Sequence, residues 1–264
     1  LPNNIISAGV NSTSQLNTIK KFIKSNKIKD TIFLIPKFKY ETEIKKGLKE
    51  SKLKISKIYE YDTEPTKLTK QIEKITNYKI RKQNLKDEIK RLEKSEDPNK
   101  EKKIKTLEKR YTLGNVNFNS VIIADFDESL KSVTTSLLYS DISPDKKYFI
   151  TLNQWFNESL IKEISLQPIY YPSINKKNWE NYKDRFYKKF KKYPNHLSLL
   201  SYDLVGLIYY LSLKNDFLTT DTQKLFKKEN SFKGKIGIFD IKNNKINHRL
   251  NFYKIEKKKI TEIF

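Results

Sequence analysis

The sequence alternates short, largely apolar runs with amphipathic segments. TIFLIP at 31–36 and SVIIAD at 120–125 are apolar over consecutive positions, which is typical of strands buried on both faces of a parallel sheet. The segment 12–26 places Leu16 and Ile19 on one helical stripe. The same two patterns predict further strands at about 54–61, 147–151 and 165–172, and further helices at 40–51, 127–140, 176–192 and 196–214. This alternation predicts an α/β fold with right-handed crossovers and a doubly wound parallel sheet.

Residues 66–110 interrupt the alternation. Apolar side chains from Leu68 to Leu92 recur at steps of three and four residues, SEDPN at 95–99 breaks the chain, and Ile104 resumes the pattern. We expect an antiparallel helical hairpin with a narrow apolar seam. Its 16 basic and eight acidic residues indicate a solvated insertion or, alternatively, an arm that docks on an acidic partner.

The segment 196–214 is apolar almost all round, and a helix of this kind is expected to be buried on most of its faces.

The tail 232–264 has a different pattern: its apolar runs are short and are separated by NN and by KKK. This pattern predicts a meander of three small strands with polar turns. Gly234 and Gly237 lack the third glycine and the following helix of a dinucleotide fingerprint, so they indicate a bend rather than a phosphate loop.

The net charge of +23 over 264 residues raises the question of nucleic acid. Lysine and arginine neutralise phosphates and release counterions, so a basic nucleic-acid-binding protein is one hypothesis. However, five of the 54 basic residues are arginines and 49 are lysines, whereas forked contacts to bases and phosphates favour arginine. We interpret most of the charge as solvated surface and expect no specific nucleic-acid partner.

Residues able to carry catalysis are scarce. The sequence has no cysteine, which excludes disulfides, thiolate metal sites and a cysteine nucleophile. His196 and His248 are far apart and lack metal-site spacing, and no carboxylate pair or nucleophile-and-base arrangement stands out. We expect no enzyme, no catalytic residue, no metal and no cofactor.

The start of the sequence bears on location. No run approaches the roughly 20 apolar residues that cross a bilayer, and LPNNIISAGV lacks the regions of a signal peptide. The chain opens on leucine and contains no methionine. We expect it to continue upstream, where an export signal and the cysteine of a lipid anchor would lie.

Four phrases stand in a recognisable order: LIPKFKYETEIKKGLKE at 34–50, RYTLGNVNFNSVIIADF at 110–126, SYDLVGLIYYL at 201–211 and FKGKIGIFDIKNNKINHRLNFYKI at 232–255. Together they resemble the type I periplasmic binding proteins, which include the Leu/Ile/Val-binding receptors. The second phrase follows a charged helical insertion at the place where the penicillin-binding protein activator branch carries one. The last two resemble a pattern that amino-acid-binding receptors share.

The resemblance implies a Venus-flytrap-like fold of two lobes joined by three crossovers. Residues 1–172 would form the α/β domain of lobe two, with the helical hairpin 66–110 inserted in it. Residues 173–231 would return as helices to an incomplete lobe one, and 232–264 would cross between the lobes as strands. The opening strands of lobe one would lie upstream. The visible remainder of lobe one is then too small to cover the apolar helix 196–214, so we predict that residues upstream of this sequence, or a partner surface, cover Leu204, Leu207, Ile208 and Leu211.

Seven residues are candidates for binding a ligand. In the family, Tyr-Gly commonly follows the first strand of lobe two and its tyrosine can line the cleft; this chain has Tyr40 followed by Glu41. The strand at 165–171 usually ends in residues that face the ligand, and here it ends in Tyr170 and Tyr171. Ligands of open α/β sheets lie at the carboxyl ends of strands, which adds Asp125, Phe126, Asp127 and Trp155.

The resemblance implies a periplasmic binding or regulatory domain, membrane-bound only through an upstream lipid anchor, whose partner is a cell-wall synthase. The alternative is a solute-binding receptor of an ABC importer for amino acids or similar small polar ligands. The helical insertion and the absence of an obvious amino-acid clamp favour the first hypothesis.

Overall fold

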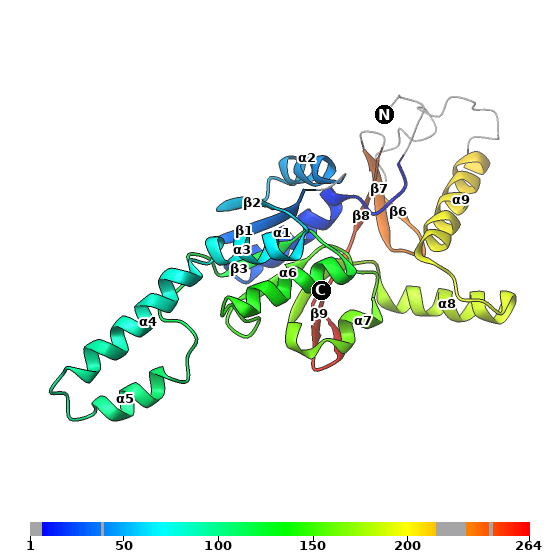
Figure 1. The fold of residues 1–264 in the computed structure, drawn as a ribbon. Coiled ribbons are helices and arrows are strands. Elements are labelled where there is room, and N and C mark those ends of the chain that lie inside the picture. The colour runs from blue at the N-terminus through cyan, green and yellow to red at the C-terminus, as the bar shows by residue number, and fades with distance from the viewer. Residues whose placement is uncertain (1–6, 38–39, 215–230, 243–244) are drawn as a thin grey trace.

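The computed structural model describes residues 7–37, 40–214, 231–242 and 245–264. These form a seven-stranded sheet in the order β10-β9-β5-β4-β3-β1-β2 (Figure 1). Strands β1 to β5 are mutually parallel, whereas β9 pairs antiparallel with β5 and β10 antiparallel with β9. The strands span β1 Thr31–Pro36, β2 Lys57–Tyr61, β3 Ser120–Ile123, β4 Tyr148–Thr151, β5 Ile169–Ser173, β9 Asn251–Glu256 and β10 Lys259–Glu262. The doubly wound α/β fold is confirmed.

Both faces of this sheet are covered, which explains why β1 is buried at every position. Successive side chains of a strand point to opposite faces. Ile32 and Leu34 accordingly pack with helices α3 (Pro65–Ile75) and α6 (Asp127–Tyr139), while Phe33 and Ile35 pack with α1 (Ser12–Ser25) and α2 (Glu41–Ser51). A strand in this position has no polar face, hence the continuous apolar run in the sequence.

Helices α1 and α2 pack so closely that one position requires glycine. A Cβ atom added at Gly47 would lie 2.3 Å from Ser12 Oγ. Ser12 Oγ also donates a hydrogen bond of 3.0 Å to the carbonyl oxygen of Glu43, one turn earlier on α2. The contact fixes the start of α1 against α2.

The helical insertion is shorter than expected. Helices α4 (Tyr78–Glu93) and α5 (Lys100–Leu107) project from the domain as an arm (Figure 1). Helix α3 was expected to belong to the hairpin, but its Leu68 and Ile72 are buried in the main core. It is the crossover helix between β2 and β3; its apolar stripe continues in phase with that of α4, so periodicity alone could not separate the two.

The tail contains five strands among the described residues, so the prediction of a three-stranded meander is wrong. Strands β6 (Phe232–Lys233), β7 (Ile238–Lys242) and β8 (Lys245–Arg249) form a separate antiparallel sheet, which we call the small sheet. Strands β9 and β10 return to the main sheet. The KKK break falls at the turn between β9 and β10, whereas the NN break at 243–244 lies outside the described residues. Neither break gave a sign that pairing changes from one sheet to the other.

Helices α8 (Lys176–Phe190) and α9 (His196–Lys214) lie beside the small sheet (Figure 1). Leu207 and Leu211 of α9 are buried against Phe239 and Ile246. The expectation that these two leucines await a cover from outside is therefore wrong, because β7 and β8 supply it. The neighbouring Ile208 is 43% exposed.

The remaining elements are α7 (Glu158–Lys162) and a short 3-10 helix (Ile164–Leu166), which the sequence did not predict.

Most of α9 is open to solvent, contrary to the expected burial on most faces. Its exposed apolar side chains are Leu197, Tyr202, Val205, Ile208, Tyr209, Tyr210 and Leu213. By length and composition, His196–Leu213 is the one described helix apolar enough to cross a bilayer, with a mean hydropathy of 1.2. The rest of the helical return expected over 173–231 falls, from 215 to 230, outside the described residues.

Candidate functional site

The carboxyl ends of the parallel strands meet at one edge of the sheet, as the topology requires. Asp125 follows β3, Asn153 and Gln154 follow β4, and Tyr61 ends β2. Ser173 ends β5 at the same edge. We call this group of side chains the strand-end site.

Asp125 is the centre of the strand-end site. Its Oδ2 accepts a hydrogen bond of 2.6 Å from the hydroxyl of Tyr61, and its Oδ1 accepts bonds from the hydroxyl of Tyr40 (3.2 Å) and the backbone N–H of Phe126 (2.9 Å). Burial raises the pKa of Asp125, while these three donors act in the opposite direction. Burial, reinforced by the negative charge of Asp125, also raises the pKa of the Tyr61 hydroxyl. Burial, and then the charge of Asp125, raises the pKa of the Tyr40 hydroxyl as well. Both tyrosines therefore stay protonated as donors.

Two amide side chains complete the polar network. Gln154 Nε2 donates to the carbonyl oxygen of Asp125 (3.0 Å) and to Thr151 Oγ1 (3.0 Å). Asn153 Oδ1 accepts bonds from the hydroxyl of Ser173 (2.8 Å) and from the backbone N–H of Trp155 (2.9 Å). The amide nitrogen of Asn153, by contrast, is buried and has no hydrogen-bond partner. This nitrogen is the one donor of the network left without an acceptor among the described residues.

The other predicted strand-end residues surround this network. The ring of Phe126 packs edge-on against Tyr40, with centroids 5.9 Å apart. Asp127 begins α6 and accepts a hydrogen bond of 2.6 Å from the Asn157 side chain. Trp155 stacks on the ring of His196, the first residue of α9, at 4.5 Å between centroids. Trp155 thus joins the strand ends to the helices beside the small sheet.

Tyr170 and Tyr171 lie apart from this group. Tyr171 is fully buried in the main core, where its ring packs against Phe156 and Tyr253. Tyr170 points to the opposite face of the sheet and packs against Phe22. The strand runs on to Ser173, so both tyrosines are interior positions of the strand and do not lie at its carboxyl end.

Sequence reasoning missed four members of the site: Tyr61, Asn153, Gln154 and Ser173. Each stands at or just past the end of a strand. The ends of β2 and β4 were predicted correctly, so the rule that selected Asp125 could also have selected Tyr61, Asn153 and Gln154; only Ser173 lay beyond a strand end that was placed too early. Tyr61 in particular was taken as the last residue of a strand with no partner in view. Its partner, Asp125, is 64 residues away.

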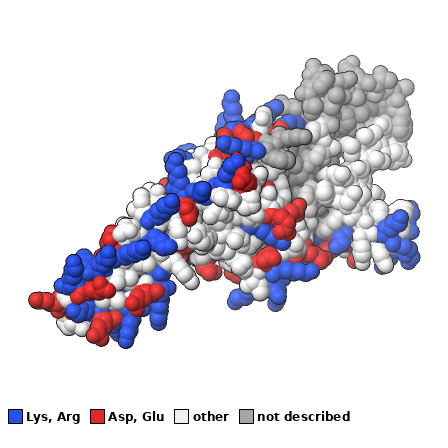
Figure 2. Space-filling view, viewed as in Figure 1, with Lys and Arg blue, Asp and Glu red and all other residues white. Residues whose placement is uncertain are grey.

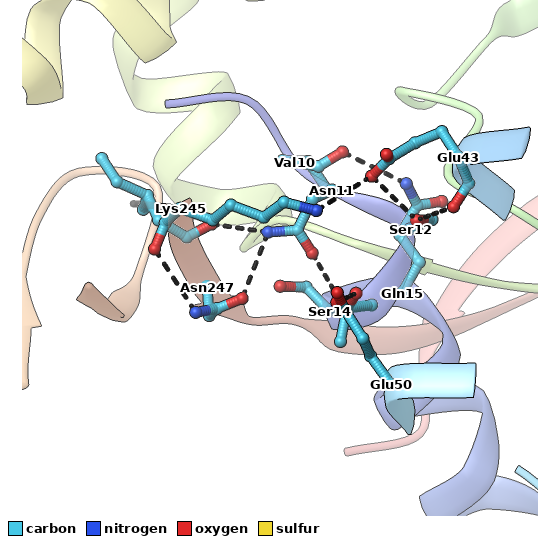
Figure 3. A network of polar contacts seen from close by, with 11 residues as sticks. Val10, Asn11, Ser12, Ser14, Gln15, Glu43, Glu50, Lys245 and Asn247 are labelled. Carbon is cyan, nitrogen blue, oxygen red and sulfur yellow. Dashed lines mark hydrogen bonds and ion pairs between the residues drawn. The ribbon is translucent and has the colours of Figure 1, made fainter. Parts of the chain in front are cut away.

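A second polar network ties the small sheet to the main domain (Figure 3). Asn11, the N-cap of α1, donates to the carbonyl oxygen of Ile246 (2.7 Å) and to Asn247 Oδ1 (3.2 Å) on β8. The ammonium of Lys245 lies 3.3 Å from the carboxylate of Glu43 on α2. The start of α1 is therefore bound both to the small sheet, through Asn11, and to α2 of the main domain, through Ser12.

Two pockets formed by the described residues lie elsewhere. One, of about 510 Å³, is at the base of the hairpin, and the other, of about 560 Å³, lies between α2 and β2. Within the described ranges there is no group of three or more His, Asp or Glu side chains able to hold a metal ion. The strand-end site itself consists of hydrogen-bonding side chains and aromatic rings.

No protein-family model and no curated protein matches this sequence. Solved structures do match in fold. The LpoA (YraM) C-domain from Haemophilus influenzae, a regulator of PBP1A, aligns with a TM-score of 0.56 at 10% identity, over 97% of this chain and 68% of that one. This chain has the fold of the type I periplasmic binding proteins. It spans 42% of a full-length LpoA structure from the same organism.

Two further matches are solute-binding proteins. The ABC transporter substrate-binding protein from Desulfitobacterium hafniense, in complex with Leu, aligns with a TM-score of 0.56 at 10% identity, over 96% of this chain and 65% of that one. A solute-binding protein from R. palustris in complex with benzoate aligns with a TM-score of 0.55 at 11% identity, over 96% and 62%. The same fold therefore occurs in a regulator and in solute-binding proteins. Fold alone does not distinguish the two functions for this chain.

Removing the carboxylate of Asp125 is expected to destabilise the fold. Asp125→Ala leaves the fully buried hydroxyl of Tyr61 without its acceptor, at a cost of about 2–3 kcal/mol in the free energy of unfolding. Asp125→Asn keeps polar atoms in place and should cost less than half as much. Urea denaturation of the two variants measures this difference; equal losses would show that the carboxyl group's hydrogen bonds do not hold the site.

Proposed function

We propose that this chain is a non-enzymatic regulatory domain that acts outside the cytoplasmic membrane by binding a cell-wall synthase. The observation that carries the proposal is the state of the strand-end site, whose polar groups are largely engaged with one another. The likeness of fold to the LpoA C-domain supports the same reading.

A receptor for a small polar ligand needs free, convergent polar groups in its cleft. In this chain the Asp125 carboxylate already accepts three hydrogen bonds, and Gln154 is turned toward the carbonyl oxygens of its own domain. A ligand would have to break these contacts in order to use the same groups. The site is therefore better suited to fixing the strand ends than to clamping a solute.

The hairpin α4–α5 provides the surface for a protein partner. It projects from the domain (Figure 1), and Figure 2 shows lysine and arginine side chains along it, mixed with acidic ones. Helix α4 carries six basic and three acidic residues. Its positive surface suits an acidic patch, since electrostatic complementarity speeds association and selects partners.

Charge reversal on α4 tests this proposal. The variant Lys79→Glu, Lys82→Glu, Lys86→Glu, Lys90→Glu changes four exposed lysines. We expect it to lose at least about tenfold in affinity for a purified peptidoglycan synthase ectodomain, measured by biolayer interferometry at physiological salt.

The matched control reverses four exposed lysines around α8, namely Lys177, Lys188, Lys189 and Lys192. It makes the same change in net charge and should retain binding. Equal loss in both variants would indicate attraction by the overall charge, and no binding by the unaltered chain would refute the proposal.

One observation favours the alternative, a solute receptor. The buried amide nitrogen of Asn153 lacks an acceptor, and a carboxylate ligand would supply one. A panel of amino acids and aromatic acids should then raise the melting temperature of the unaltered chain, but not that of Asn153→Ala, through preferential binding to the folded state. A flat response across the panel would remove this alternative.

A further inference from the structure

A pocket of about 510 Å³ lies where the hairpin joins the domain. Its walls are the segment 109–116, which returns from α5 to β3, and the loop 141–147, which leads from α6 to β4. Both segments precede their strands. The pocket therefore opens at the amino-terminal edge of the sheet, opposite the strand-end site, and none of the groups discussed above contributes to it. We call it the hairpin-base pocket.

Its lining is strongly basic, with one carboxylate, Asp141, against five cations. That carboxylate is already engaged, since Asp141 Oδ2 lies 3.7 Å from Arg81 Nη2 and also accepts a hydrogen bond from Thr112. The Arg81 guanidinium is engaged as well, by the carbonyl oxygens of Gly114 (3.2 Å) and Ser140 (3.1 Å). Arg81 thus builds the pocket wall and offers little to a ligand.

The other four cations are not paired with a carboxylate of the described residues. Lys109, Arg110, Lys146 and Lys147 make no ion pair with any residue that the structure describes. Lys147 is partly buried, and its pKa is lowered first by that burial and then by the positive charge of Arg81. Holding an ammonium group there costs free energy, and a bound anion would offset this cost.

We propose that the hairpin-base pocket binds a small ligand carrying two or more phosphate charges. Phosphate oxygens accept several charge-assisted hydrogen bonds at once, which suits a concave group of lysines with one arginine. The ring of Tyr111, 76% exposed, lines the same pocket and offers a surface on which a sugar or base attached to the phosphate would stack. The volume fits a small molecule.

Isothermal titration of the full chain with pyrophosphate, at an ionic strength of about 0.15 M, tests the proposal. The variant Lys146→Gln, Lys147→Gln should bind about tenfold or more weakly, since each charged hydrogen bond contributes about 1.5–3 kcal/mol. The control Lys102→Gln, Lys105→Gln removes the same charge from exposed positions on α5 and should bind like the unaltered chain.

Absence of binding by the unaltered chain would overturn the proposal. Equal weakening in the two double variants would overturn it as well, because the general positive field would then explain the binding. Hydrogen exchange gives a readout without any substitution: pyrophosphate should protect 109–116 and 141–147 and leave the strand-end segment 152–157 unchanged. If pyrophosphate slowed hydrogen exchange over the whole hairpin instead, the proposed location of the binding site would be wrong.

Discussion

Replacing Arg81 with methionine is expected to lower the free energy of unfolding by about 3–5 kcal/mol. Arg81 is 7% exposed and donates to three carbonyl oxygens, those of Gly114, Ser140 and, at 3.5 Å, Asp141, and to the hydroxyl of Thr112 (2.7 Å). Methionine fills a similar volume but leaves these acceptors unsatisfied and Asp141 without its ion pair. Urea denaturation followed by far-UV circular dichroism measures the loss.

Arg91→Met is the matched control, since it removes an arginine from the same helix. Arg91 is exposed and pairs with Glu88 one turn away, and exposed pairs of this kind contribute about 0.5 kcal/mol or less. If the two variants lost equal stability, the guanidinium of Arg81 would not be what anchors the hairpin to the loop that follows α6.

Arg81 shows why the sequence predicted the fold better than the contacts that hold it together. The order of strands and helices could be predicted because strands buried on both faces, such as 31–36, carry an unbroken apolar run, while helices carry a stripe. Arg81 stands among other charged residues on an amphipathic helix, where it looked like part of a solvated face. Its acceptors belong to segments 33 and 59 residues away along the chain, and the local pattern does not encode such pairings.

The same reasoning accounts for what the sequence could and could not locate at the strand-end site. The rule that ligands lie at the carboxyl ends of parallel strands selected Asp125, which proved to be the centre of a polar network. It also selected Tyr171, because β5 was expected to end before Ser173; a strand end placed too early makes a core residue look like a residue at the ligand-facing edge. The sequence also did not predict that β9 pairs with β5 of the main sheet, because antiparallel pairing between distant segments leaves no local pattern in the sequence.

Acid is expected to destabilise the chain through His248. This residue lies on β8, is 6% exposed, and packs beside Phe239 with ring centroids 5.6 Å apart. Burial lowers the pKa of His248 from 6.5 to about 4. The unfolded chain therefore binds a proton below pH 6.5 that the folded chain refuses until about pH 4. Stability from this residue is fully present above the first value and is lost as the pH falls toward the second, by about 3 kcal/mol in total.

The variant His248→Gln isolates this effect, because glutamine does not titrate. Its own cost is the same at every pH, so the difference in free energy of unfolding between the unaltered chain and the variant should shrink by about 3 kcal/mol from neutral pH to about pH 4. Asp125 acts in the opposite sense: its raised pKa means that the folded chain gains protons relative to the unfolded chain as the pH falls. The subtraction removes that contribution, which both proteins share. If the difference in free energy of unfolding stayed constant across this range, the pKa of His248 would be the same in the folded and unfolded chains.

The position of His248 also says where the acid-induced opening should begin. The backbone N–H of His248 donates to Ser14 Oγ (3.0 Å), and the adjacent Asn247 and Ile246 hold Asn11, so protonation would act on the strand that docks the small sheet on α1. Local opening needs less free energy than global unfolding. Both tryptophans, Trp155 and Trp179, pack in the cluster beside this junction. Tryptophan fluorescence should therefore change at a higher pH than far-UV circular dichroism in the unaltered chain, whereas the two signals should coincide in His248→Gln.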